Sequence, residues 1–486
     1  PAAVHMYVLG SDGSTDLYRE QDPGFFLGIS ESQSGDYIFI GAGSHTTSEV
    51  HYFEAGAEAP VLKTVAARET DVEYSVEHWG DQFVISTNAD GAVDFKIVTA
   101  PVAAPGRDNW SELVPHQAGT LILGMDALKD HLIRLERHEG LPRIVVRERA
   151  TGTEETISFE EEAYALGTSV GYEYDTTQMR ISYSSPSTPS QTFDYDLVSK
   201  DRILRKEQDV PSGHDATDYV VKRVLAPARD GASVPVTILY HKDTPIDGSA
   251  PMLLYGYGSY GITISASFRT TPLALANRGM VYAIVHPRGS MAKGYQWYLD
   301  GKLEKKPNTF NDYIDAGNHL IGAGYSARGN VVGMGGSAGG LLMGAVANQD
   351  PEMFAGIIAA VPFVDVINTM SDETLPLTPP EWPEWGNPLI SAEDYDTMMA
   401  YSPYDQVTAR NYPSMLITGG LSDPRVTYWE PSKWAAILRH EAPEAGPYYL
   451  RINMDAGHGG ASGRFEGLKE TALEYAFALD VVGKAE

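Results

Sequence analysis

The apolar residues follow two different patterns along the chain, which change near residue 215. Before that point, short strand-like apolar runs begin at Asp36, Asp81, Asp130 and Gln178, at intervals of 45, 49 and 48 residues. A repeat of this length, with about four strands in each unit, is typical of β-propeller blades. We therefore predict that residues 1–215 form an incomplete β-propeller portion of about four blades.

The second pattern begins after the boundary that we expect at 211–215. Alternating runs at 219–221 and 234–240 open a new sheet, and further apolar strands are expected at 252–254, 330–332, 412–420 and 448–452. Several of these strands run directly into loops that carry polar residues. Because open α/β sheets bind ligands beyond the carboxyl ends of their strands, these loops are candidates for a functional site.

The clearest chemical signal is a serine enclosed by glycines, Gly335-Gly336-Ser337-Ala338-Gly339. It lies between the apolar run 330–332 and the helix-like run 341–346. A Gly-x-Ser-x-Gly turn between strand and helix is the nucleophile elbow of an α/β-hydrolase, because a Cβ on the flanking residues would clash there. By itself the pattern arises by chance in roughly one chain in three of this composition, so its context carries the assignment.

Two partners for the serine follow in the order that α/β-hydrolases use. Asp423 lies just beyond the strand expected at 412–420, and His458 lies in the loop after 448–452. A serine hydroxyl is a weak nucleophile until a base removes its proton, so we expect His458 to act as base and then as acid. Asp423 would orient the imidazole. Each residue alone would be an ordinary loop residue, and their order behind an elbow favours catalysis.

The sequence from about residue 216 to the end resembles the prolyl oligopeptidase family, and most closely its oligopeptidase B group. The matching segments are collinear and lie at 255–261, 297–302, 333–340, 361–366, 384–388 and around Asp423 and His458. The resemblance implies an α/β-hydrolase catalytic domain at 216–486, with a doubly wound, mostly parallel sheet, and an amino-terminal β-propeller domain.

The resemblance also implies roles for residues outside the triad. The second tyrosine of Tyr255-Gly256-Tyr257-Gly258 would donate its hydroxyl to the oxyanion, and the backbone N–H of Ala338 would be the other donor. Arg425 would bind a substrate carbonyl. A tyrosine packed in the core and a surface arginine are the alternative interpretations of Tyr257 and Arg425.

Relatives of the oligopeptidase B group cut after Arg or Lys, and their acidic pocket includes a glutamate that matches Glu381. Pro383 replaces a second acidic residue, and the neighbouring Glu384 is therefore also a candidate for binding the substrate. Two aspartates that receive the next basic side chain match Ser265 and Ser267. Because serine cannot replace a carboxylate that faces a guanidinium, we expect little preference for paired basic residues.

Two further departures concern a loop and the length of the chain. Ser290-Met291-Ala292 stands where the family has glycines followed by a glutamate, which makes the loop bulkier and removes a carboxylate. Family members carry seven blades, so about three blades and the amino-terminal helices are expected to be absent. An open arc of blades exposes sheet edges, which predicts a missing amino-terminal segment of the same protein as a partner.

Composition narrows the class of partner. The formal net charge is −29, and residues 1–215 account for −20 of it with 16 basic and 36 acidic side chains. Such acidity attracts cationic peptides and disfavours nucleic acid, although it could serve only solubility. There are no cysteines, no membrane-spanning apolar run and no signal-peptide core, so we expect a cytoplasmic protein. The scattered histidines lack ligand spacing, and we expect no metal or cofactor.

These observations predict a serine endopeptidase that hydrolyses short, cationic peptides after Arg or Lys through an acyl-enzyme. Three alternatives remain open. The chain could be a peptidase of the same family with non-basic specificity, such as a prolyl or acylaminoacyl type. It could be an inactive fragment that acts as a binding module. A carboxylesterase would use the same triad but fits poorly, because it should lack propeller blades.

Overall fold

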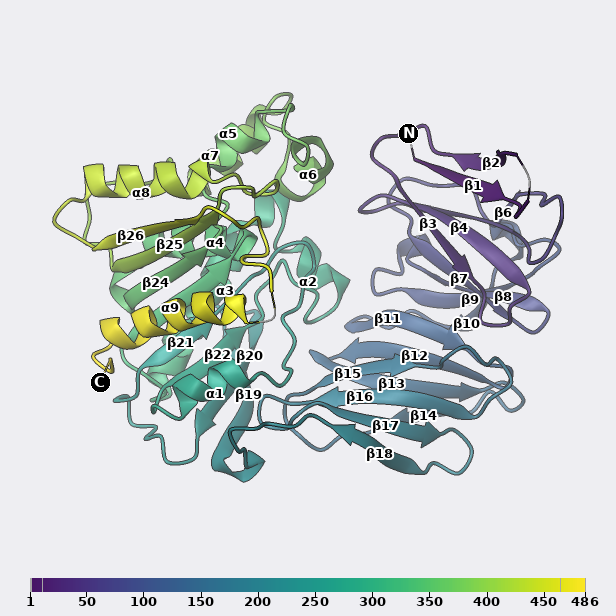
Figure 1. The fold of residues 1–486 in the computed structure, drawn as a ribbon, viewed down its shortest axis with the longest axis horizontal. Helices are drawn as coiled ribbons and strands as arrows, with labels where there is room; N and C mark the ends of the chain where they lie inside the picture. Colours follow the sequence, from purple (N-terminus) through teal and green to yellow (C-terminus); the bar gives the residue numbers. More distant parts are fainter. Residues whose placement is uncertain (1, 11, 464, 486) are drawn as a thin grey trace.

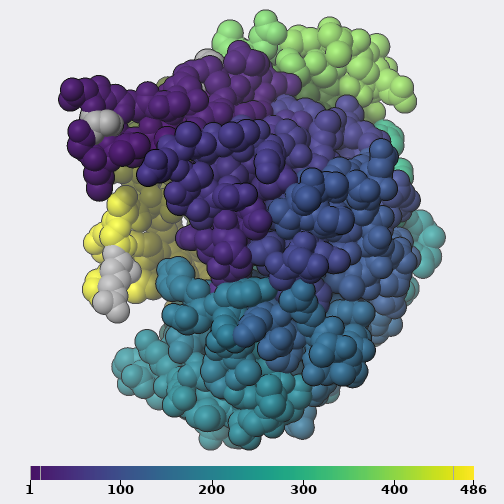
Figure 2. Space-filling model, turned by 90° about the vertical axis from the view of Figure 1, so that its right-hand side faces the viewer, coloured from purple at the N-terminus to yellow at the C-terminus, as the bar shows by residue number. Residues whose placement is uncertain are grey.

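The computed structural model describes residues 2–10, 12–463 and 465–485, which form two bodies lying side by side (Figure 1). The amino-terminal body consists of antiparallel sheets, and the carboxy-terminal body is a mixed sheet covered by helices. Viewed from the side of the antiparallel sheets, these sheets cover much of the second body (Figure 2). No helix among the described residues has the length and apolar character that a membrane crossing requires.

The amino-terminal body begins with a hairpin of β1 (Ala3–Tyr7) and β2 (Ser14–Arg19), and four antiparallel sheets of four strands follow in sequence order. The first contains β3 (Phe26–Glu31), β4 (Tyr37–Gly43), β5 (Ser48–Glu54) and β6 (Lys63–Thr64). The second contains β7 (Tyr74–Trp79), β8 (Gln82–Thr87), β9 (Lys96–Pro101) and β10 (Ser111–Val114). The third contains β11 (Thr120–Ala127), β12 (His131–His138), β13 (Leu141–Glu148) and β14 (Glu154–Ile157). The fourth contains β15 (Ala165–Ser169), β16 (Gln178–Ser184), β17 (Gln191–Asp196) and β18 (Arg202–Glu207).

The four runs that set the sequence period are the second strands of these sheets, β4, β8, β12 and β16. They are well buried because a second strand has a neighbour on both sides within its own sheet. Side chains such as Phe83, Ile133 and Ile181 are fully excluded from solvent and pack between adjacent sheets. The outer strand β18 is exposed along its whole length, which explains why outer strands give a weaker sequence signal.

The carboxy-terminal body is built on one eight-stranded sheet in the order β19-β20-β22-β21-β23-β24-β25-β26. Its strands are β19 (Tyr219–Pro227), β20 (Ser233–His241), β21 (Met252–Tyr255), β22 (Val281–Val285), β23 (Val331–Gly336), β24 (Phe354–Ala360), β25 (Ser414–Gly420) and β26 (Tyr448–Asn453). The pairs β19–β20 and β20–β22 are antiparallel, and the strands from β22 to β26 are parallel. This topology, beside propeller-type sheets, confirms the predicted fold class.

Helices cover both faces of this sheet. α3 (Pro307–Gly322), α4 (Ala338–Gln349) and α8 (Trp429–Glu441) contribute side chains to one buried cluster, and α1 (Thr270–Ala276) and α9 (Glu466–Val481) contribute to the other. Three helices, α5 (Val366–Met370), α6 (Thr378–Trp385) and α7 (Ala392–Tyr401), are inserted between β24 and β25. They form the green projection at the upper edge of the second body (Figure 1). A short helix, α2 (Tyr295–Leu299), faces the antiparallel sheets.

The two bodies are joined by hydrogen bonds and ion pairs as well as by the chain. Asp94, which is buried, accepts a hydrogen bond of 2.6 Å from the backbone N–H of Tyr295 at the start of α2. Arg137 in β12 donates to the backbone carbonyl of Met291 at 3.1 Å. These contacts hold the loop 290–294 against the second and third sheets, beside the site described next.

Candidate active site

Ser337 lies on a sharp turn between β23 and α4, as expected for a nucleophile elbow. Its backbone has φ 59° and ψ −121°, which is costly for a residue with a side chain. A Cβ added to Gly335 would lie 2.3 Å from the carbonyl oxygen of Gly339, and one added to Gly340 would lie 2.4 Å from Cα of Pro362. The glycines are therefore required for close packing around the turn.

Three side chains from distant loops meet at this turn. His458 Nε2 is 3.0 Å from Ser337 Oγ, and His458 Nδ1 is 2.7 Å from Asp423 Oδ2. The other oxygen of Asp423 accepts hydrogen bonds from the backbone N–H groups of Arg425 and Val426, at 2.8 and 3.0 Å. The Asp423 side chain is completely buried, so its carboxylate is held by fixed donors and can orient the imidazole.

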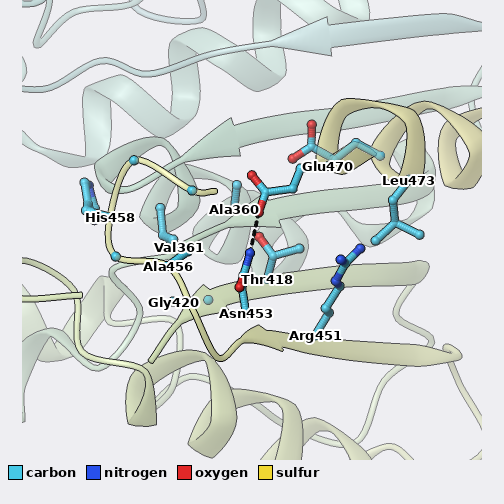
Figure 3. A pocket seen from close by; sticks show the side chains of 15 residues that line it. Ala360, Val361, Thr418, Gly420, Arg451, Asn453, Ala456, His458, Glu470 and Leu473 are labelled. Atoms are coloured by element: carbon cyan, nitrogen blue, oxygen red, sulfur yellow. Dashed lines mark hydrogen bonds between the residues drawn. The ribbon is translucent and has the colours of Figure 1, made fainter. Parts of the chain in front are cut away.

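The loop that holds His458 is supported from behind by α9. Glu470 accepts a hydrogen bond of 2.8 Å from the side-chain amide of Asn453, and Figure 3 shows this pair beside the loop. Glu470 also accepts from the backbone N–H of Ala461 at 3.3 Å. A cavity of about 180 Å³ lies between the loop and α9. The position of His458 therefore depends on contacts beyond the three meeting side chains.

Tyr257 and Ala338 lie next to Ser337. The Tyr257 hydroxyl interacts with the Ser337 side chain, and burial raises the pKa of Tyr257 to about 12, so the hydroxyl keeps its proton. Ala338 is the first residue of α4, where backbone N–H groups have no partner within the helix. Both residues line the same cavity as Ser337, so two N–H or O–H donors face the place where a substrate carbonyl would react.

The cavity in front of Ser337 has a volume of about 360 Å³. Its walls come from the elbow, the 257–262 loop, the segment from Thr369 to Glu381 and the Asp423 loop, and also include Phe26 and His45 from the first antiparallel sheet. Arg425 lines it with an exposed side chain. Residues from both bodies therefore enclose the candidate site. No sequence pattern marks Phe26 or His45, because their position at the site depends on how the bodies are placed.

Glu381 and Glu384 occupy different positions. Glu381 lines the large cavity, and its Oε2 accepts hydrogen bonds from the Tyr260 hydroxyl at 2.6 Å and from Trp385 Nε1 at 3.0 Å. Glu384 is only 4% exposed, and its two oxygens accept from the Tyr260 backbone N–H at 2.9 Å and the Tyr298 hydroxyl at 2.6 Å. Glu381 is thus presented to the large cavity, whereas Glu384 is engaged beneath it.

The positions at which the sequence departs from its relatives divide between two further cavities. Met291 and Pro383 line a cavity of about 90 Å³ that also contains Glu381, Glu384 and Glu73 of the second antiparallel sheet. Ser265 and Ser267 line a separate cavity of about 20 Å³, together with Arg269. Met291 and Pro383 therefore border the acidic region, while the two serines lie elsewhere.

Glu430 is a buried carboxyl group at the candidate site that sequence reasoning did not identify. It lies at the start of α8, is fully buried, and lines the large cavity. It accepts hydrogen bonds from the backbone N–H groups of Val364 and Asp365 and from the Thr369 hydroxyl. Burial raises the pKa of Glu430 to about 7. Its carboxyl group fixes the strand-to-helix loop that forms one wall of the site.

No group of three or more His, Cys, Asp or Glu side chains within residues 2–10, 12–463 and 465–485 is arranged to hold a metal ion. The structure contains a hydroxyl, an imidazole and a buried carboxylate in hydrogen-bond contact, with two hydrogen-bond donors beside the hydroxyl. This arrangement is suited to acyl transfer. An α/β sheet with this site, covered by propeller-type sheets, defines the architecture of a two-domain serine hydrolase.

Comparison with known proteins identifies the family. Residues 266–485 match the prolyl oligopeptidase family, and residues 2–208 match the prolyl oligopeptidase N-terminal beta-propeller domain. The chain belongs to the prolyl oligopeptidase family of serine peptidases. This confirms the resemblance found in the sequence.

Individual relatives cover almost all of this chain. It is 45% identical to dipeptidyl aminopeptidase BI of Pseudoxanthomonas mexicana over 99% of its length, and 40% identical to protease 2 of Moraxella lacunata, also over 99%. Oligopeptidase B from Leishmania major superposes with a TM-score of 0.93 at 36% identity, over 100% of this chain. Oligopeptidase B from Trypanosoma brucei with covalently bound antipain, in a closed form, gives 0.94 at 36%, over 99%.

This chain spans only about two thirds of the length of these relatives. It covers 66% of the dipeptidyl aminopeptidase, 69% of protease 2 and 69% of each oligopeptidase B chain.

Proposed function

We propose that this chain is a serine endopeptidase that hydrolyses short peptides after Arg or Lys. The observation that carries the proposal is the alignment of Ser337 Oγ, the His458 imidazole and the Asp423 carboxylate, with separations of 3.0 and 2.7 Å. Membership of a serine peptidase family supports it. The proposed domains are a β-propeller portion at 1–215 and a peptidase domain at 216–486.

In the proposed mechanism, His458 Nε2 takes the proton of Ser337 as Oγ attacks the scissile carbonyl carbon. The carbonyl oxygen becomes an oxyanion, which accepts hydrogen bonds from the Tyr257 hydroxyl and the Ala338 N–H. The imidazolium is stabilised by Asp423 and gives its proton to the leaving amine, which leaves an acyl-enzyme on Ser337. A water molecule, deprotonated by His458, then releases the acid and restores the serine.

The proposed preference for basic residues rests on Glu381. Its carboxylate borders the cavity that contains Ser337, and a guanidinium or ammonium group there would form a charge-assisted hydrogen bond. We assign Glu384 a supporting role beneath Tyr260, because both of its oxygens are already engaged. Arg425 is proposed to bind a substrate carbonyl. The net charge of −29 would favour the approach of cationic peptides.

A second candidate is the release of dipeptides from free amino termini. It is favoured by the 45% identity to a protein named dipeptidyl aminopeptidase BI. The two functions differ in the substrate end that they require. An endopeptidase cuts peptides whose amino terminus is blocked, whereas a dipeptidyl aminopeptidase needs the free α-amino group two residues before the cut.

The test is cleavage of a peptide library, presented with free and with acetylated amino termini, with Ser337→Ala as the blank. We expect cuts after Arg and Lys in both sets, and a large drop in kcat/KM for Glu381→Gln, which preserves size but removes the charge. Glu393→Gln, which removes an exposed carboxylate in the first turn of α7 that does not line the cavity, is the matched control. Equal cutting by wild type and Glu381→Gln would refute the pocket assignment. Cuts confined to the second peptide bond from a free amino terminus would favour the dipeptidyl aminopeptidase function.

A fluorophosphonate probe separates an active enzyme from a binding module. We expect the probe to label wild type at Ser337 and to leave Ser337→Ala unlabelled. A wild-type chain that is folded but unlabelled would indicate that it acts as a binding module.

A further inference from the structure

Lys306 is a buried lysine that the proposed mechanism does not use. It precedes α3, and only 1% of its surface is exposed. Its Nζ donates hydrogen bonds to the backbone carbonyl of Gly258 at 2.6 Å and to the Ser259 hydroxyl at 2.7 Å. The ammonium group also lies 5.0 Å from the ring centroid of Trp385. Burying an ammonium is expensive, and its partners here are a carbonyl, a hydroxyl and an aromatic ring.

Glu384 holds the next residue of the same loop. This carboxylate is 4% exposed and accepts a hydrogen bond of 2.9 Å from the backbone N–H of Tyr260. Lys306 and Glu384, which carry opposite charges, thus form hydrogen bonds to three consecutive residues of the loop, Gly258, Ser259 and Tyr260. We call these two residues the loop clamp.

The gripped loop has an unfavourable backbone that needs such support. Gly258 has φ +78°, and a Cβ there would lie 2.4 Å from Cγ2 of Thr309. Tyr260, which has a side chain, has φ 57°. Backbones of this kind persist only when surrounding contacts fix them. The clamp supplies contacts to the peptide groups between these two positions.

Both ends of the loop face the candidate active site. Tyr257 precedes the gripped residues, and its hydroxyl interacts with Ser337. Tyr260 ends the loop, and its hydroxyl donates to Glu381 at 2.6 Å. A shift of the gripped backbone would therefore move the oxyanion donor and the wall of the acidic pocket together.

We propose that Lys306 is a positioning residue, which with Glu384 fixes the 257–260 loop so that the Tyr257 hydroxyl is aimed at the oxyanion. This inference rests on the proposed function. Because an oxyanion donor acts most strongly in the transition state, loosening the clamp lowers kcat by a larger factor than it raises KM. Misplacement of a catalytic group by about 1 Å costs on the order of 100-fold in rate.

The charge of Lys306 gives the proposal a second readout. Burial lowers the pKa of Lys306 to about 8, and the negative charge of Glu384 opposes this effect. Glu384 is the charged group that acts on Lys306, while the loop and Trp385 present uncharged groups to it. Loss of the proton weakens both charge-assisted hydrogen bonds, so kcat of the wild type falls as the pH rises above about 8.

The experiment measures kcat and KM on a blocked arginine aminomethylcoumarin amide between pH 6 and pH 9.5. We expect Lys306→Met to lower kcat by about 10- to 100-fold with KM within threefold. Ser259→Ala removes one partner of Nζ and should lower kcat by a smaller factor. Lys306→Arg keeps its charge throughout this range and should lose the alkaline fall in kcat while retaining activity at pH 7.

Ser326→Ala is the matched control for Ser259→Ala, because both serines are buried and both hydroxyl groups are hydrogen-bonded. The Ser326 hydroxyl donates to the backbone carbonyl of Asn330 in the loop before β23, away from the clamp. Circular dichroism establishes that each variant is folded. If Lys306→Met does not fold, Ser259→Ala decides. An unchanged kcat in folded Ser259→Ala, a loss confined to KM, an equal loss in Ser326→Ala, or the same alkaline fall in Lys306→Arg would each overturn the proposal.

The fluorophosphonate probe keeps this test distinct from the test of the proposed function. A wild-type chain that is neither labelled at Ser337 nor active would defeat the proposed function. A labelled, active wild type whose clamp variants behave identically to it would defeat only the clamp.

Discussion

Tyr257 is the residue for which the structure gives the sharpest single-atom prediction. Tyr257→Phe removes only the hydroxyl that faces Ser337. Loss of one oxyanion donor costs about 3–4 kcal/mol of barrier, so we expect kcat to fall by roughly 10²–10³ with little change in KM. Tyr255→Phe removes a hydroxyl at the end of the preceding strand and should keep kcat within twofold of wild type. A Tyr257→Phe enzyme with normal kcat would eliminate this residue as an oxyanion donor.

At the residue scale, the sequence predicted which side chains would meet but not how they would be used. Ser337, Asp423 and His458 were identifiable because each follows a strand of one parallel sheet, so topology alone brings them to the same edge. Glu384 was a candidate for substrate binding, because it lies beside Pro383, which replaces an acidic residue of the relatives. Only the structure shows that both oxygens of Glu384 already accept hydrogen bonds, from the Tyr260 backbone N–H and the Tyr298 hydroxyl.

At the scale of elements, the junction between β23 and α4 should tolerate no added atom. In Gly340→Ala, the new methyl group would lie 2.4 Å from Cα and 3.3 Å from N of Pro362, both of which belong to the backbone. Such overpacking costs about 1–3 kcal/mol of folding free energy, and it would also displace the elbow. Gly467→Ala in α9 meets no atom within 4 Å and should stabilise the fold by about 0.5–1 kcal/mol.

Urea unfolding of both variants checks this prediction, and fluorophosphonate labelling follows the elbow. Gly340→Ala with wild-type stability and labelling would show that the turn can relax.

The elements themselves were predictable where burial imposes a strict period. The second strand of each antiparallel sheet was found because it is buried between two strand neighbours, as in β8 with its run of buried residues. Short or exposed strands, such as the two-residue β6 and the fully exposed β18, carry no such pattern. The inserted helices α5–α7 were missed for a different reason: α6 contains three prolines in eight residues, and its shape depends on contacts with the rest of the domain.

At the scale of the whole molecule, buried carboxyl groups should make a contribution to stability that declines from pH 5 to pH 8. Buried histidines, whose pKa values are lowered by burial, contribute in the opposite direction; they are His51, His78, His131 and His286. Burial raises the pKa of Glu77, Glu430 and Glu474 to about 7 each. A carboxyl group whose folded-state pKa lies above the unfolded value near 4.5 stabilises the fold fully below that value. This stabilisation is lost as the pH rises through 7. For the fully buried Glu430, the loss is on the order of 1–3 kcal/mol.

Thermal unfolding of wild type and Glu430→Gln at pH 5 and pH 8 isolates the contribution of Glu430, because the two proteins share the same histidines. Glu430→Gln can keep the same pattern of partners without ionising, so its melting temperature should fall less over the same interval. A pH dependence identical to that of wild type would exclude Glu430 as a contributor.

The placement of the two bodies was the part of the molecule that the sequence could not specify. Phe26, His45 and Glu73 come from the antiparallel sheets, yet they border cavities that contain Glu381. Nothing in their local sequence marks them, because a loop residue becomes part of a site only when another domain is brought against it. Sequence periods describe each body separately and carry no information about the contact between them.

The short span from Tyr257 to Tyr260 has a consequence for how this enzyme could diverge. In the proposed mechanism one end of the span serves turnover and the other serves substrate choice, so a mutation that reshapes the pocket would also displace the reaction centre. A change in substrate specificity should therefore lower kcat, even for peptides that fit the new pocket well. Recovery would require compensating changes beneath the span, at positions that never meet the substrate.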